Sequence, residues 1–157
     1  MEIKLIGIGK TDKTELDQLI KSYQNRLMHY VRFSFEIIPD LKNSKNLSER
    51  LQKKEEGKII LSKISNSDRL ILLDENGQEM NSVGFSNFLQ KQMNSGLKRL
   101  VLVIGGPYGF SEDVYKKASS KLALSKMTFS HQMVRLFIIE QLYRSFTILK
   151  NEPYHHR

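Results

Sequence analysis

The 157-residue sequence contains no cysteine, so it can form no disulfide and offers neither a thiolate metal site nor a cysteine nucleophile. No stretch approaches the roughly 18 consecutive apolar residues that a membrane-spanning helix needs. The first ten residues, MEIKLIGIGK, have an acidic residue and a short apolar run where a secretory signal has a basic start and a longer apolar segment. We therefore expect a soluble, cytoplasmic protein with no membrane association and no metal.

Four common nucleotide-binding or catalytic motifs are also missing. The sequence has no GxxxxGK[ST] phosphate loop, no HExxH metal-binding pair and no GxSxG nucleophile turn. Gly7 and Gly9 follow an apolar run, but Asp12 stands where a dinucleotide-binding fingerprint requires its third glycine. His155 and His156 have no third ligand at metal-site spacing. These absences weigh against P-loop, dinucleotide-binding, zinc-protease and serine-hydrolase chemistry.

The charge balance favours a polyanionic partner without requiring one. The chain has 25 Lys and Arg against 17 Asp and Glu, which gives a net charge of +8. Such an excess attracts phosphate backbones and raises the local concentration of anions. Many small soluble proteins are basic for solubility alone. The net charge therefore does not decide between a polyanionic partner and simple solubility.

Apolar patterns predict strands and helices in alternation. Strands are expected at 3–8, 31–37, 69–73, 99–104 and 122–124, where short apolar runs or period-two patterns occur. Helical spacing predicts helices at 14–27, 48–64, 83–93, 111–117 and 131–150. We expect Asp74 to end its strand and Asn76–Gly77 to form a turn. The order predicts an α/β fold, a mainly parallel sheet with helices on both faces, in one domain over 1–157.

Three predicted strand ends carry residues suited to binding a ligand, because ligands of parallel sheets bind beyond the carboxyl ends of strands. The loop 105–109, GGPYG, follows a buried strand, and missing β-carbons would let a ligand approach the backbone. Leu73–Asp74 ends another strand, and 122–129, LALSKMTF, combines apolar and hydroxyl residues. An ordinary glycine turn, a capping aspartate and a core strand are the respective structural alternatives.

The last predicted helix and the tail hold a second group of candidates. Glu140 and Arg144 have the i,i+4 spacing of an ordinary surface ion pair, and His131 could cap the helix or act in catalysis. The tail 153–157, PYHHR, has an aromatic ring, imidazoles and a guanidinium, which could stack on a base, exchange a proton and hold phosphate. A frayed terminus is the alternative for the tail.

Together these blocks resemble the signature of the ribosomal RNA large subunit methyltransferase H family, in the SPOUT class of S-adenosylmethionine-dependent RNA methyltransferases. The resemblance spans the chain from KLIGIGK at its start through LLD, VIGGPYGF, LALSKMTF, HQMVRLFIIEQLYRSF and PYHHR. It implies a C-terminal α/β trefoil knot and a homodimer with the active site at the subunit interface. It also implies methylation of N3 of a pseudouridine in large-subunit (23S) rRNA within the ribosome.

The resemblance assigns roles to named residues. S-adenosylmethionine is implied to bind against Leu73, Gly105, Leu124, Ser125, Lys126, Met127, Thr128 and Phe129. The imide proton at N3 must leave, and a base or a cation at the developing oxyanion would help. The catalytic candidates are Arg144, Tyr154, His155 and His131, with no single general base assigned. Ser130 stands where the family commonly has proline, and serine can also cap a helix.

Two alternatives to this function are kept open. The chain could be a ribosome-associated RNA-binding protein that has lost catalysis, in which case it would bind the cofactor without methyl transfer. It could instead be a SPOUT methyltransferase acting on another RNA such as tRNA. Activity on tRNA but not on ribosomes would indicate the second alternative.

Overall fold

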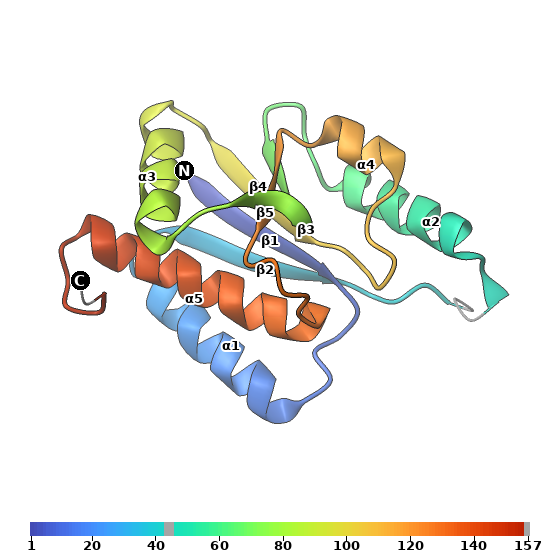
Figure 1. Cartoon of the computed structure of the whole chain (residues 1–157), viewed down its shortest axis with the longest axis horizontal. Coiled ribbons are helices and arrows are strands. Elements are labelled where there is room, and N and C mark those ends of the chain that lie inside the picture. The colour runs from blue at the N-terminus through green and yellow to red at the C-terminus, as the bar shows by residue number, and fades with distance from the viewer. Residues whose placement is uncertain (43–45, 156–157) are drawn as a thin grey trace.

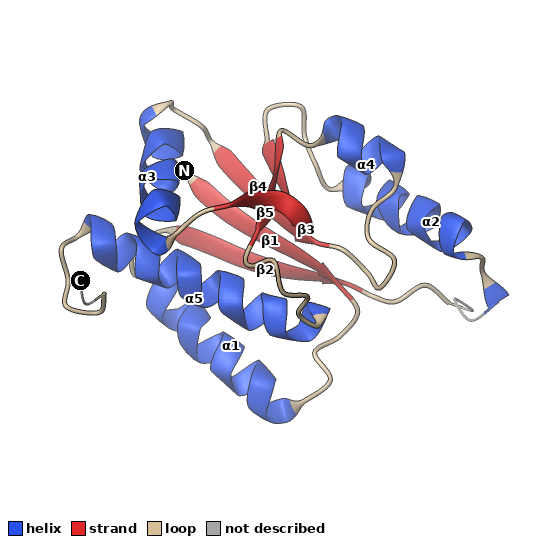
Figure 2. Cartoon of the chain, in the orientation of Figure 1, coloured by secondary structure: helices blue, strands red, loops and turns tan. Residues whose placement is uncertain are grey.

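The computed structural model describes residues 1–42 and 46–155, and its strands form one parallel sheet in the order β2-β1-β4-β3-β5 (Figures 1 and 2). Each adjacent strand pair runs parallel. The elements alternate along the chain as predicted, and their bounds are β1 (Glu2–Ile8), α1 (Thr14–Leu27), β2 (Arg32–Ile38), α2 (Glu49–Ser62), β3 (Arg69–Glu79), α3 (Ser82–Asn94), β4 (Arg99–Ile104), α4 (Glu112–Lys117), β5 (Ser120–Ala123) and α5 (His131–Leu149).

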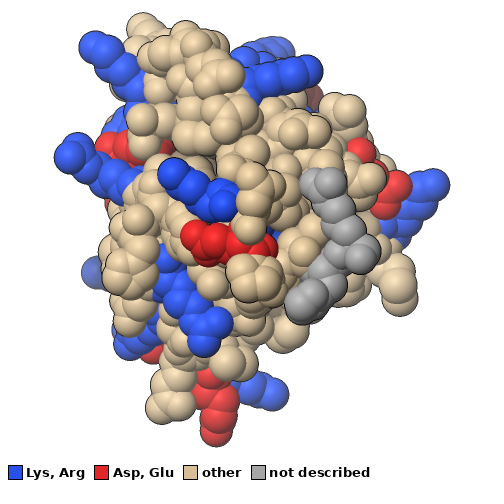
Figure 3. All heavy atoms as spheres, turned by 90° about the vertical axis from the view of Figure 1, so that its left-hand side faces the viewer, with Lys and Arg blue, Asp and Glu red and all other residues tan. Residues whose placement is uncertain are grey.

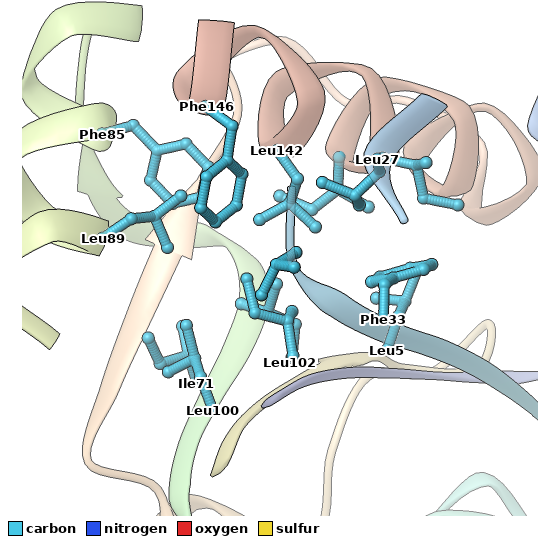
Figure 4. Packing of buried hydrophobic residues seen from close by; sticks show 14 of the residues in the cluster. Leu5, Leu27, Phe33, Ile71, Phe85, Leu89, Leu100, Leu102, Leu142 and Phe146 are labelled. Carbon is cyan, nitrogen blue, oxygen red and sulfur yellow. The ribbon is translucent and has the colours of Figure 1, made fainter. Parts of the chain in front are cut away.

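Helices cover both faces of the sheet, which confirms the predicted α/β architecture. Helices α1, α3 and α5 pack on one face and α2 and α4 on the other (Figure 1). Successive strand residues point to opposite faces, so Leu102 joins the core under α5 while Val103 joins the core under α2. Figure 4 shows the larger core, where Phe85 and Phe146 from two helices meet the side chains of the sheet.

Strand β3 is longer than the sequence predicts, so the expected end at Asp74 and turn at Asn76–Gly77 are wrong. The strand continues to Glu79 and pairs with β5 on both sides of an irregularity between Leu73 and Gln78. A Cβ at position 77 would lie 2.6 Å from the backbone carbonyl carbon of Leu122, so only glycine permits this approach. Pairing with a distant strand therefore overrides the local turn preference.

The start of α5 is held in place at the carboxyl end of β1. Ser130 caps the helix, because its Oγ accepts from the backbone amide three residues later at 3.3 Å. Arg135 is fully buried and donates to the backbone carbonyls of Ile8, at 2.6 Å, and Gly9, at 2.8 Å. It also donates to the Thr11 hydroxyl at 3.1 Å. These bonds fix the first turns of α5 beside the strand ends.

The remaining predictions concern membrane-spanning helices, metal sites, the C-terminal knot and the number of domains. No helix in the described ranges combines the length and apolarity needed to cross a bilayer. Residues 1–42 and 46–155 also contain no cluster of three or more His, Asp or Glu side chains placed to hold a metal ion. The C-terminal knot implied by the resemblance stays a prediction, as does the assignment of residues 1–157 to one domain.

Candidate functional site

A cavity of about 650 Å³ lies beyond the carboxyl ends of β4 and β5, beside the middle of β3, where the pairing of β3 with β4 ends at Leu73. This is the edge where ligands of open parallel sheets bind, and the volume suits a ligand of nucleotide size. Three segments of the chain form its walls, with one further residue each from α4 and α5. The segments are 73–76, 104–110 and 122–131, the last without Ala123 and Lys126, and the two further residues are Tyr115 and Val134. The three segments that the sequence indicated therefore meet at one cavity, although β3 continues past its segment.

Most of the residues predicted to bind the cofactor line this cavity. They are Leu73, Gly105, Leu124, Ser125, Met127, Thr128 and Phe129. Lys126 belongs to the same loop but is not part of the cavity wall. Met127 is 73% exposed and Phe129 is 37% exposed, so large apolar side chains stand open to solvent at the cavity mouth. A planar apolar ligand group could cover this surface.

The glycine loop packs closely against neighbouring side chains, which leaves little room for β-carbons at two of its positions. A Cβ at Gly105 would lie 3.1 Å from the Phe110 ring, and one at Gly106 would lie 2.6 Å from Glu56 Oε2. Gly109 has φ of 77°, in the region that favours glycine, and its amide donates to the Gly106 carbonyl at 3.1 Å. Close packing is thus a second reason for these glycines, beside the space for a ligand that the sequence predicts.

An acidic corner closes one side of the cavity. Asp74 accepts a hydrogen bond from the Tyr115 hydroxyl at 2.6 Å, and Glu75 accepts one from the Thr128 hydroxyl at 2.8 Å. Burial acts to raise the pKa of Asp74, but hydrogen bonds from Tyr115 and the Asn76 amide outweigh it and lower that pKa. Burial and Asp74 raise the pKa of Tyr115 to about 12. The corner therefore carries negative charge beside the apolar walls.

The sequence marked the position of Asp74 but not its partners. Tyr115 lies on α4, which follows the glycine loop in the chain, and its hydroxyl contacts Asp74 on β3. Glu75 was expected near a turn, and the extended β3 instead brings its side chain to the 124–129 loop. No local pattern in the sequence signals either contact.

The other catalytic candidates form a separate cluster at the far end of α5. The Tyr154 hydroxyl donates to Glu140 Oε1 at 2.9 Å and shares a hydrogen bond with the Tyr23 hydroxyl at 3.2 Å. Arg144 donates to the same Glu140 oxygen at 2.6 Å, and its guanidinium lies 4.7 Å from the centre of the Tyr154 ring. The Nδ1 of His155 lies 3.4 Å from an Arg144 nitrogen. The described part of the tail is therefore packed on the protein.

Charge states in this cluster follow from its contacts. Glu140 raises the pKa of Arg144, so the guanidinium stays cationic. Burial, then hydrogen bonds with Tyr23 and Glu140, raise the pKa of Tyr154, so its hydroxyl stays protonated and can act as a donor. The Glu152 carboxylate likewise raises the pKa of Tyr30, on the loop after α1, to about 12 by accepting its hydrogen bond. His156 and Arg157 lie outside the described residues.

The predicted catalytic residues are divided between two places in one chain. His131 opens α5 and lines the cavity, while Arg144 lies on the same helix roughly 20 Å further along at 1.5 Å per residue. Tyr154 and His155 contact Arg144 and not the cavity wall. The sequence predicted each residue but could not show this separation. It also missed Tyr23, which α1 contributes to the tail cluster.

Comparisons with known proteins identify the family. A family model described as "Predicted SPOUT methyltransferase" matches residues 1–155. Proteins named ribosomal RNA large subunit methyltransferase H are 69% identical in Christiangramia forsetii and 68% identical in Flavobacterium johnsoniae, each over the full length of both chains. One from Parabacteroides distasonis is 60% identical over 99% of both chains. The chain therefore belongs to the SPOUT methyltransferase family, and within it to the ribosomal RNA large subunit methyltransferase H proteins.

Proposed function

We propose that this protein transfers a methyl group from S-adenosylmethionine to N3 of a pseudouridine in large-subunit rRNA on the ribosome. The observation that carries the proposal is the cavity beyond the ends of β4 and β5 and beside the middle of β3, whose wall contains Leu73, Gly105 and most of the 124–129 loop. The names of relatives up to 69% identical over the whole chain support rRNA as the substrate class. We also propose a single domain with the knot of the SPOUT class.

The cavity residues fit S-adenosylmethionine, which supplies an activated methyl group on a cationic sulfonium. Leu73, Leu124 and Phe129 offer apolar surfaces for the adenine, and the backbone of Gly105–Gly106 can approach the ligand without side chains between. The acidic corner of Asp74 and Glu75 offers negative charge to a ligand that carries positive groups. Lys126, which the resemblance also assigns to cofactor binding, would act only from outside the cavity wall.

A complete catalytic site requires a second copy of the chain. The cavity and the tail cluster of one chain are separated along α5, so one chain alone does not place Arg144, Tyr154 and His155 beside its own cofactor. We infer a homodimer in which the tail of one subunit reaches the cavity of its partner. The exposed Met127 and Phe129 at the cavity mouth would be covered by this arrangement.

The charge states of the tail cluster suit the chemistry at N3. Removal of the N3 proton leaves negative charge on the uracil ring, and a cationic Arg144 can stabilise it. Tyr154 keeps its proton, so it serves as a hydrogen-bond donor and not as a base. The imidazoles of His155 and His131 are the side chains able to accept the N3 proton. Positioning of the reacting atoms would supply much of the acceleration.

A basic surface supports RNA as the partner. The chain carries a net charge of +8. Figure 3 shows Lys and Arg side chains distributed over the face that includes the C-terminal end of α5, with smaller acidic groups between them. Such a surface favours a phosphate backbone over a neutral small substrate.

The test is transfer of labelled methyl from S-adenosylmethionine to ribosomes from cells lacking the modification, with mass mapping of the product nucleoside. We expect one methylated pseudouridine in the large-subunit rRNA. Label on tRNA but not on ribosomes would replace this substrate with another RNA. Cofactor binding with no transfer to either would indicate the non-catalytic RNA-binding protein.

A further inference from the structure

A buried carboxyl group lies beneath the glycine loop of the cavity and is not explained by the proposed chemistry. Glu56, on α2, is only 3% exposed. Its Oε1 accepts a hydrogen bond from Gln52 Nε2 at 2.8 Å, but its Oε2 has no partner among the described residues. Burying a polar atom without a hydrogen-bond partner destabilises the folded state, so Glu56 is a candidate for a functional role.

The second carboxyl oxygen lies against the loop that lines the cavity. The Cβ that any other residue would place at position 106 would be 2.6 Å from Glu56 Oε2, closer than nonbonded atoms approach. Gly106 itself is part of the cavity wall and accepts the hydrogen bond from Gly109 that closes the loop. The carboxyl group therefore contacts the outer side of the same backbone whose inner side faces the cavity.

Gly57, the next residue on α2, lies close to the other end of this loop. A Cβ at Gly57 would lie 2.3 Å from the Ser111 Oγ and 3.2 Å from a methyl group of Val114. Ser111 directly follows the loop and precedes α4. The Glu56–Gly57 pair thus supports both ends of the 106–111 segment from below.

We propose that Glu56 is a positioning residue for the cofactor cavity: its carboxyl group, packed beneath Gly106, sets how far the Gly105–Gly106 backbone projects toward S-adenosylmethionine. The inference rests on the proposed function, because it takes S-adenosylmethionine as the ligand. Glu56 is absent from the cavity wall, so it acts through the loop and not on the methyl group. Burial also raises the pKa of Glu56, although the hydrogen bond from Gln52 opposes this shift.

A double-mutant cycle tests the contact through cofactor affinity measured by calorimetry. Gly106→Ala should weaken S-adenosylmethionine binding at least about tenfold, because the new methyl group and the carboxyl cannot share the space. Glu56→Ala should also weaken it, since the loop loses its support. The double variant should bind better than Gly106→Ala alone, because the smaller side chain at 56 leaves room for the added methyl. Additive losses would overturn the proposal.

Two further variants separate positioning from general stability. Glu56→Gln keeps the shape of the side chain that packs beneath Gly106, so its affinity should stay within about twofold of the wild type. Gln92→Ala is the matched control, because Gln92 is a 6% exposed polar residue on α3 with an unpartnered Oε1 away from the cavity. It should lower the melting temperature but leave cofactor affinity unchanged. Equal affinity losses in Gln92→Ala and Glu56→Ala would contradict a positioning role.

Hydrogen exchange of the peptide covering 105–110 tests the same role without any ligand. Glu56→Ala should accelerate exchange in this peptide, and Gln92→Ala should not. Unchanged exchange in Glu56→Ala would overturn the proposal. If the wild type failed to bind S-adenosylmethionine, the proposed function would fail, while this measurement would still decide whether Glu56 positions the loop.

Discussion

The hydroxyl of Tyr154 donates a hydrogen bond to Glu140 Oε1 at 2.9 Å, which fastens the C-terminal tail to α5. The Tyr154 ring also packs edge-on against Tyr143 at a centroid distance of 4.7 Å and lies under the Arg144 guanidinium. Because these contacts hold the ring from three sides, the tail presents His155 in a defined place beside Arg144. Contacts within the chain thus hold in place the tail residues that we propose to act in catalysis.

Removal of the tail should separate binding from catalysis. A chain ending at Pro153 lacks Tyr154 and His155 but keeps the whole cavity wall, so S-adenosylmethionine should bind normally and methyl transfer should be lost. Tyr154→Phe should retain the packing against Tyr143 and lose about tenfold in turnover, since only the hydroxyl contacts disappear. Calorimetry and labelled-methyl transfer give the two readouts. Full turnover by the truncated chain would remove both residues from the mechanism.

Mixed dimers of two inactive variants, Gly105→Leu and the chain truncated after Pro153, should be active. Gly105→Leu should destroy the cavity, and truncation after Pro153 should remove the tail. A mixed dimer keeps one intact cavity facing one intact tail, so coexpression should recover about one quarter of the wild-type activity. Each variant alone should be inactive. No recovery in purified mixed dimers would show that a single chain supplies the whole site.

Gly105→Leu should abolish cofactor binding by displacing Phe110. A β-carbon at this position already lies 3.1 Å from the Phe110 ring, which is buried below the loop. The larger side chain must therefore move the ring or the loop. Gly96→Ala is a suitable control, because Gly96 has positive φ of 74° but nothing near its Cβ and no part in the cavity. Calorimetry should show lost affinity only for Gly105→Leu, and retained affinity in that folded variant would refute the explanation.

Arg135→Met should destabilise the protein by about 3 kcal/mol. The change removes the donors to the carbonyls of Ile8 and Gly9 and leaves these acceptors in a buried place. Arg32→Met, at an exposed position on β2, should change stability by less than about 0.5 kcal/mol. Urea unfolding of both variants measures the difference. Similar unfolding midpoints would show that the buried guanidinium is not needed to hold the start of α5.

Glu56→Gln should change how stability depends on pH. Burial raises the pKa of Glu56 above its ordinary value of 4.5; the bond from Gln52 opposes this shift and Asp40 adds to it. The folded state therefore holds this proton more tightly than the unfolded chain, and the stability from this group is full below pH 4.5 and lost as pH rises toward the raised pKa. The glutamine variant lacks this loss, so its free energy of unfolding should increase relative to that of the wild type as pH rises. Parallel stability curves from urea unfolding across this window would contradict the shift.

Much of the fold and of the cavity could be predicted from the sequence. Apolar runs such as 69–73 and 99–104 locate the buried strands, because only a strand covered on both faces tolerates apolar residues at successive positions. Parallel strands then bring their carboxyl ends to one edge, so Leu73, Gly105 and Leu124 meet although they are distant in the chain. Ser48 and Ser130 also cap helices as their sequence positions indicate.

The sequence by itself thus determined the alternation of elements and most of the three segments that line the cavity, since these depend on local patterns and on one rule of parallel sheets. Only the tertiary structure decided the extension of β3 past Asp74, the packing of Tyr154 on Tyr23 and Glu140, and the position of Glu56 beneath Gly106. The physical reason is that these contacts join segments far apart in the chain. Their geometry is set by how whole helices and strands pack, which no local pattern records.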